Sequence, residues 1–106
     1  SACNPYLAFS VMLAAGLKGV EEEYPLPPAV EGNVFSMANE ERVSRDIKIL
    51  PGSMGEALAL AEESTLLREA LGEHIFTSFI RNKKIEWGQY RSTVTDYEIS
   101  RYLPVL

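Results

Sequence analysis

Residues 1–19, "SACNPYLAFSVMLAAGLKG", open the chain with no charged side chain in their first 17 positions. At about 100° per residue, a helix through this stretch carries apolar side chains on every side. Asn4 followed by Pro5 is a typical helix start and Gly19 a typical stop, so we expect a helix over 5–18. A helix that is apolar all round is normally enclosed by other protein or by lipid.

Lipid is the weaker explanation for this apolar run. A spanning helix needs about 20 apolar residues, and polar or basic residues bound this run at both ends. A secretory signal needs basic residues before the apolar stretch and a small-residue cleavage site after it, and neither is found. We therefore expect protein to enclose the helix. Because no initiator Met is present, we also expect a chain that is processed or cut from something longer.

The composition is that of one acidic domain. The 106 residues suffice for a single core, and 10 basic against 15 acidic residues give a net charge of −5. Nucleic acid is not an expected partner, because phosphate binding needs a basic patch. Cys3 is the only cysteine and cannot form an internal disulfide, which suits a reducing, cytoplasmic compartment. We expect it to be a small buried hydrophobe.

Helix signals continue along the rest of the chain. Three prolines within four residues predict a loop over 24–36. Ser53 and Glu56 have capping-box spacing and predict a helix over 54–63, and Thr95 and Glu98 repeat this spacing and predict a helix that starts at Asp96. No stretch shows sustained two-residue alternation, so we expect a mainly α fold with little or no sheet. The remaining expected elements are a short helix after Ser36, helices over 66–71, 74–94 and 96–102, and an apolar tail over 102–106.

The longest periodic segment, 74–94, carries large aromatic side chains at helical spacing. A stripe of this kind is far more often part of a core than a platform on which nucleic-acid bases stack. We therefore expect core positions for these aromatic residues, which are Phe76, Phe79, Trp87 and Tyr90.

No arrangement of residues matches a catalytic motif. His74 is the only histidine, and with a single cysteine it excludes a histidine–cysteine metal cluster. The adjacent glutamates 21–23 point in different directions, which favours a solvated acidic loop over a cation site. Gly52 and Gly55 precede a helix but lack the lysine and the spacing of a phosphate-binding loop. The sequence therefore predicts no catalytic, cofactor-binding or metal-binding residue in this chain.

Four stretches together carry a family resemblance: "NPYLAFSVMLAAGLKG" (4–19), "LPGSMGEAL" (50–58), "ALGEHIFTSFIRNKKIEWGQYR" (70–91) and "VTDYEISRYLPVL" (94–106). In order and spacing they resemble the C-terminal end of type I glutamine synthetases of bacteria and archaea. The resemblance implies a longer enzyme that uses ATP and Mg²⁺ or Mn²⁺ to activate glutamate as γ-glutamyl phosphate, which ammonia converts to glutamine. This chain would belong to its larger α/β catalytic domain, with the apolar helix at the centre.

The resemblance places the family's catalytic arginines, metal-binding glutamates and nucleotide contacts before residue 1. It therefore transfers no catalytic residue to this chain. In some members a tyrosine in a loop resembling "NVFSM" (33–37) is adenylylated, and Phe35 stands at the matching position. Because a phenyl ring has no hydroxyl to modify, the resemblance argues against this form of regulation.

The resemblance also implies an assembly. The family forms two face-to-face rings of six subunits, and the C-terminal tail of each subunit reaches into a pocket of the opposite ring. The stretch "ISRYLPVL" (99–106) resembles that tail, and an exposed apolar chain end is what a tail awaiting a partner should have. The expected inter-subunit residues are Tyr102, Leu103, Pro104, Val105 and Leu106.

Two hypotheses remain open. In the first, the chain is a segment of a glutamine synthetase that supports the catalytic domain and ring assembly without containing catalytic residues. In the second, it is a standalone helical protein-interaction module. The coding sequence upstream of Ser1 distinguishes them. Under either hypothesis, the apolar first helix predicts that the isolated chain self-associates.

Overall fold

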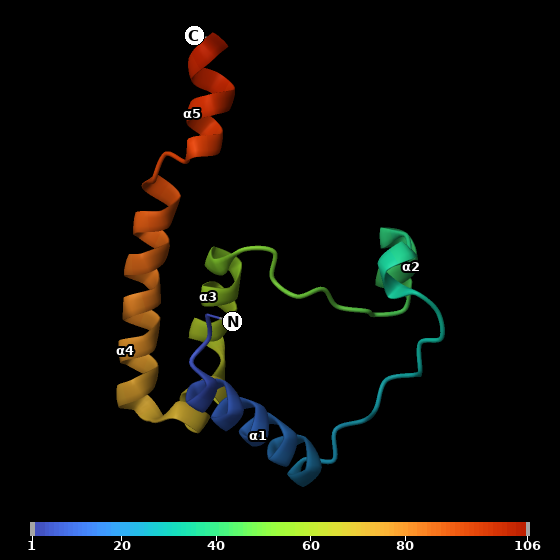
Figure 1. The fold of residues 1–106 in the computed structure, drawn as a ribbon. Coiled ribbons are helices and arrows are strands. Elements are labelled where there is room, and N and C mark those ends of the chain that lie inside the picture. The colour runs from blue at the N-terminus through green and yellow to red at the C-terminus, as the bar shows by residue number, and fades with distance from the viewer. Residues whose placement is uncertain (1, 106) are drawn as a thin grey trace. The chain divides into compact units, whose positions relative to one another are not determined.

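The computed structural model of this chain describes residues 2–105. The chain divides into two compact units, the first ending at Gly52 and the second beginning at Ser53 (Figure 1). The boundary between the two units follows Pro51 and Gly52, a pair that is typical of loops. The predicted mainly α fold is confirmed, since the described residues form helices and turns and contain no strand.

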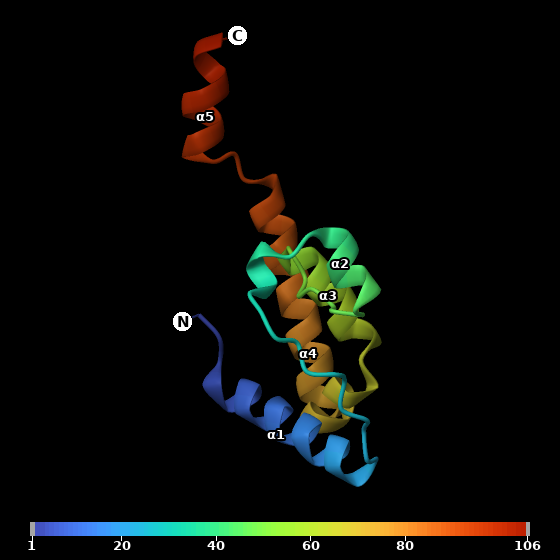
Figure 2. The ribbon, with the colours of Figure 1, turned by 90° about the vertical axis from the view of Figure 1, so that its right-hand side faces the viewer.

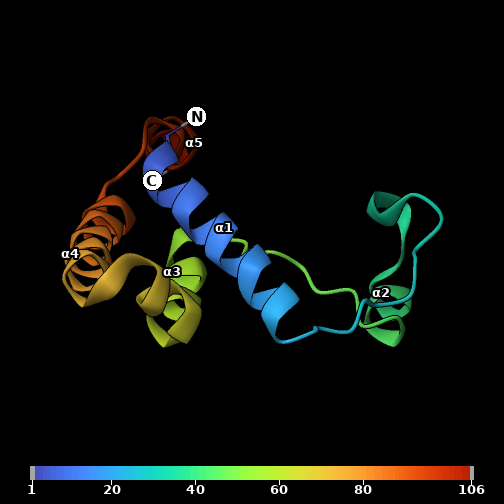
Figure 3. The same cartoon turned by 90° about the horizontal axis from the view of Figure 1, so that it is seen from below.

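The main element of the first unit is α1 (Pro5–Glu21), which Figure 3 shows along its length. Asn4 caps its start, because its side-chain oxygen accepts hydrogen bonds from the backbone N–H groups of Tyr6 (3.0 Å) and Leu7 (3.4 Å). The helix was predicted to end at residue 18 but continues through Gly19 to Glu21. It stops where Glu23 takes a left-handed conformation (φ 51°), which an α-helix cannot include.

The first unit continues as an extended chain with two short helical elements. The predicted loop 24–36 contains a single 3₁₀ turn at its end, η1 (Val34–Ser36), which the side chain of Asn33 caps. The short helix expected after Ser36 is α2 (Asn39–Ser44), and no side-chain hydrogen bond caps its start at Ala38.

The second unit contains a helical hairpin. Its first arm is α3 (Met54–Glu63), whose bounds match the predicted 54–63, and the Ser53 hydroxyl accepts a hydrogen bond from the Glu56 N–H at 3.2 Å. Its second arm is α4 (Thr65–Ser92), which joins the two predicted helices 66–71 and 74–94 across a sharp bend at Gly72.

The bend depends on glycine. Gly72 has φ 73° and ψ 156°, a backbone conformation that side chains with a Cβ atom rarely adopt. Because the helix resumes immediately after this one residue, the segments on either side remain close enough to interact. The bend turns the residues before it back toward α3, where Leu67 and Leu71 pack against the core.

The core of the second unit lies between the two arms of the hairpin. Leu58 from α3 and Phe76 and Ile80 from α4 are buried, with Phe76 only 3% exposed. Two further residues of the predicted aromatic stripe, Phe79 and Trp87, pack partly buried against this cluster. Tyr90 is an exception to the prediction.

Tyr90 is 65% exposed because it lies near the end of α4, beyond the reach of α3. Its ring stacks on that of Trp87 with 5.9 Å between centroids, so Tyr90 shields part of the Trp87 ring from solvent.

The chain ends in α5 (Asp96–Tyr102), at the predicted bounds, and a 3₁₀ turn, η2 (Leu103–Val105). Figure 2 shows α5 beyond the C-terminal end of α4. The predicted apolar tail 102–106 therefore begins at the last residue of a helix and continues as a further turn. Its final residue, Leu106, lies outside the described residues.

Candidate functional site

Histidine, cysteine and acidic side chains are the residues most often used in metal and catalytic sites. Within residues 2–105, no three histidine, cysteine or acidic side chains gather as a metal ion would require. His74 is exposed on α4. Cys3, predicted to be buried, is exposed, because it precedes α1 and nothing in the first unit covers it.

The glutamates 21–23 diverge at the end of α1. Glu22 pairs with Lys18 at 3.9 Å, while Glu23 occupies the left-handed position that follows the helix. The Tyr24 hydroxyl donates a hydrogen bond to the Glu22 carboxylate, which raises the pKa of Tyr24. These contacts fit the predicted solvated acidic loop better than a cation site.

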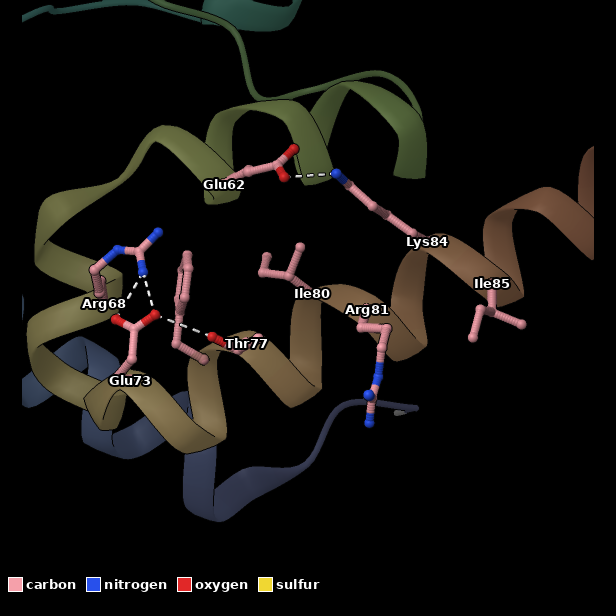
Figure 4. Close-up of a pocket in the computed structure, with 9 residues that line it drawn as sticks. Glu62, Arg68, Glu73, Thr77, Ile80, Arg81, Lys84 and Ile85 are labelled. Carbon is pink, nitrogen blue, oxygen red and sulfur yellow. Dashed lines mark hydrogen bonds and ion pairs between the residues drawn. The ribbon is translucent and has the colours of Figure 1, made fainter.

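A hollow of about 540 Å³ lies beside the hairpin core (Figure 4). Phe76 and Ile80 form its apolar part, and charged side chains from both arms of the hairpin surround them. This hollow could not be predicted from the sequence, because residues as far apart as Glu62 and Lys84 come together in it only through folding.

One ion pair beside the hollow spans the Gly72 bend. An Arg68 nitrogen, Nη1, donates to both carboxylate oxygens of Glu73 at 2.6 and 2.7 Å, and the Thr77 hydroxyl donates to the same carboxylate at 3.1 Å. The Arg68 guanidinium also lies 4.2 Å from the centroid of the Phe76 ring, as a cation–π contact. The hydrogen bond from Arg68, and to a smaller extent that from Thr77, lowers the pKa of Glu73.

A second ion pair joins the two arms of the hairpin. Lys84 Nζ lies 2.5 Å from the Glu62 carboxylate, while Arg81 points to the other side of α4 (Figure 4). Both ion pairs are largely exposed, and such pairs typically contribute about 0–1 kcal/mol. Four of the charged side chains that line the hollow are paired, Arg68 with Glu73 and Lys84 with Glu62, and these contacts join parts of the hairpin.

The apolar surface of α1 is a different kind of candidate. None of its described residues is buried. Leu7 and Val11 are half-buried, and six other large apolar side chains are more than half exposed, namely those of Tyr6, Phe9, Met12, Leu13, Leu17 and Val20. The sequence predicted that protein encloses this helix, and the described residues of the first unit do not supply that cover. A surface of this kind is typical of an interface.

The predicted inter-subunit residues lie at the C-terminal end of the second unit. Tyr102 ends α5, and Leu103, Pro104 and Val105 form η2. All four side chains are exposed, so these consecutive residues present an apolar surface at the end of the second unit. The fifth predicted residue, Leu106, falls outside the described residues.

Phe35 lies in the middle of η1 and is 99% exposed. Its backbone N–H donates to the Asn33 side-chain oxygen at 3.0 Å, and the Ser36 hydroxyl donates to the Asn33 carbonyl at 2.9 Å. These local hydrogen bonds fix the turn, and the phenyl ring is exposed to solvent. The position is accessible, but the side chain offers no hydroxyl to a modifying enzyme.

A helix that crosses a bilayer must be both long and apolar. Within the described part of the chain, none combines the length and the apolarity that crossing a membrane requires.

Comparison with known proteins gives a consistent result. The family model of the glutamine synthetase catalytic domain matches residues 1–102, which leaves Leu103, Pro104, Val105 and Leu106 beyond the matched range. Glutamine synthetase of Mycolicibacterium smegmatis is 56% identical over 103 residues, which are 97% of this chain and 23% of that protein.

More distant relatives match over similar ranges. Glutamine synthetases of Thermus thermophilus and Methanococcus maripaludis are 46% and 44% identical over 95% and 98% of the chain. The chain spans about 23% of the length of each of these relatives. A match that covers nearly every residue agrees with the four stretches quoted above, and the chain belongs to the glutamine synthetase family, within its catalytic domain.

Proposed function

We propose that this chain is the C-terminal portion of a longer glutamine synthetase, an ATP-dependent ligase that joins ammonia to glutamate. The family match over residues 1–102, with 56% identity to a glutamine synthetase, carries this proposal. Because the chain spans 23% of that relative's length, most of the proposed enzyme consists of residues outside this chain.

In this proposal the chain contributes support and assembly. The α1 helix would be enclosed by the rest of the catalytic domain, which would explain why its large apolar side chains are exposed here. Full burial of each such side chain is worth about 1.5–3 kcal/mol, so the burial of six of them strongly favours association of α1 with other protein. ATP and Mg²⁺ or Mn²⁺ would bind residues outside this chain.

The proposed assembly is the double ring of six subunits each that the family resemblance implies. Tyr102, Leu103, Pro104, Val105 and Leu106 would reach from one ring into the other, and the exposure of the first four supports this role. When isolated, the chain would bury α1 against another copy. A cytoplasmic location and the absence of adenylylation at Phe35 also stay predictions.

An enzyme assay of the full-length protein tests the proposal. We expect glutamine to form from glutamate and ammonia, dependent on ATP and divalent metal. The 106-residue chain alone should form none. Glutamine formation by the chain alone would refute the division of roles, and an inactive, correctly assembled full-length protein would refute the ligase activity.

The exposed α1 surface also fits the alternative, a standalone helical module that binds other proteins. An open reading frame that begins at Ser1 would favour this alternative, while a frame that continues upstream into the remainder of a catalytic domain would exclude it.

A further inference from the structure

Within the described residues of the second unit, the last helix has little support from other elements. It comprises seven residues, Asp96–Tyr102, and its main contacts are with the turn η2 that follows it. Helices shorter than about 12–15 residues are marginal in water when they pack against nothing. The helical form of α5 must therefore depend on local interactions until a partner covers it.

Those local interactions form a complete capping box. The Thr95 hydroxyl accepts a hydrogen bond from the Glu98 N–H at 3.3 Å, and the Glu98 carboxylate accepts from the Thr95 N–H at 2.8 Å and from the Thr95 hydroxyl at 2.9 Å. Two backbone donors at the helix start are thus satisfied by side chains. Acidic residues in the first turn and Arg101 in the last also complement the helix dipole.

The capped helix presents apolar side chains. Tyr97, Ile99 and Tyr102 are exposed on α5, and Leu103 and Val105 follow on η2. A segment ordered before it docks loses less conformational freedom on binding than a flexible one. The start of α5 can therefore influence how readily the residues at its far end associate.

We propose that the Thr95–Glu98 capping box positions the C-terminal tail for docking on a second copy of the protein. The inference rests on the proposed function, in which this tail joins the two rings. Thr95 and Glu98 act as positioning residues: they hold α5 helical and thereby set where the exposed side chains of residues 102–105 lie relative to the subunit. Neither side chain needs to touch the partner.

The test measures ring pairing of the full-length protein by mass photometry over a concentration series. Thr95→Ala and Glu98→Ala each remove one half of the capping box. We expect each to raise the concentration at which the rings separate by about fivefold or more, because the loss of a capping interaction lowers the helix–coil equilibrium constant by a factor of about this size. Thr95→Ser and Glu98→Gln keep capping-competent side chains and should pair nearly as the unaltered protein does.

Glu86→Ala is the matched control. It removes an exposed carboxylate that pairs with Lys83 within α4, at 2.5 Å, and it leaves the capping box intact. This variant should pair like the unaltered protein. Amide hydrogen exchange of residues 97–99 gives a second readout, since Thr95→Ala and Glu98→Ala should speed exchange there and Glu86→Ala should not.

Removal of residues 102–106 distinguishes failure of the positioning role of Thr95 and Glu98 from failure of the proposed inter-ring tail contact. If this truncation splits the rings but Thr95→Ala and Glu98→Ala pair normally, the positioning role is overturned and the tail contact stands. If the truncated protein still pairs normally, the inter-ring tail of the proposed function fails, and the positioning role fails with it. Equal weakening by alanine and by the conservative variants would also overturn the positioning role, because it would point to contact with the partner.

Discussion

A Cβ atom on Gly55 would lie 2.9 Å from both Cε2 and Nε1 of the Trp87 indole. The start of α3 therefore approaches the end of α4 as closely as a glycine permits, and the indole ring covers the bare backbone. The contact fixes one end of the hairpin, while Leu58, Phe76 and Ile80 form its buried centre.

Replacing Gly55 by alanine should destabilise the hairpin. The new methyl group would displace ring atoms of a side chain that is packed against the core, and overpacking of this kind costs about 1–3 kcal/mol. Denaturant unfolding followed by Trp87 fluorescence measures the change. Gly88→Ala is the control, because a Cβ there has nothing within 4 Å and should be neutral or stabilising. Equal stability of the two variants would contradict the close approach.

Gly72→Ala should destabilise the protein for a different reason. Space is available at this position, but the backbone has φ 73°, and alanine in a sparsely populated conformation costs about 1–3 kcal/mol. Thermal unfolding compares it with Gly16→Ala, which places a methyl group on α1, also in open space, at helical φ and ψ. If the bend needs the positive φ of Gly72, Gly72→Ala lowers the melting temperature more than Gly16→Ala does, and equal melting temperatures would contradict this need.

Two phenylalanines give a matched pair of truncations. Phe76 is 3% exposed and contacts both the core and Arg68, so Phe76→Ala should lower the free energy of unfolding by about 3–5 kcal/mol. Phe35 is 99% exposed, and Phe35→Ala should change the same quantity by less than about 0.5 kcal/mol. A large loss at Phe35 would show that the ring has a partner within the protein.

The Arg68–Glu73 ion pair predicts a pH dependence. Hydrogen bonds from Arg68 and Thr77 lower the pKa of Glu73 below its ordinary value of 4.5. A lowered folded-state pKa gives stability that is present above the ordinary value and is lost as the pH falls through the folded-state value. NMR titration of Glu73 should therefore give a lowered pKa that rises in Arg68→Met, and an unchanged pKa in that variant would contradict the assignment.

Much of the fold could be predicted because its signals are local. Asn4–Pro5, Ser53 and Thr95 mark helix starts through side-chain and backbone chemistry within three residues. The α1 helix begins at Pro5, and α3 and α5 begin directly after Ser53 and Thr95. Gly19 misled the prediction of the α1 end, because a glycine can stay helical and the left-handed residue is Glu23.

The features that could not be predicted depend on residues distant in sequence. The Lys84–Glu62 pair and the exposure of Tyr90 both follow from where α3 lies along α4, and no local pattern encodes that position. For the candidate tail, the resemblance indicated which residues matter. The capping-box spacing of Thr95 and Glu98 predicted the helix start that precedes them, and the structure shows both backbone hydrogen bonds of the box.

The most direct test of the central claim is glutamine formation by the full-length protein. Purified protein, supplied with glutamate, ammonia, ATP and Mg²⁺, should produce glutamine and inorganic phosphate in equal amounts, and omission of ATP or of the metal should abolish both products. Failure of a folded, assembled full-length protein to form glutamine under these conditions would contradict the account.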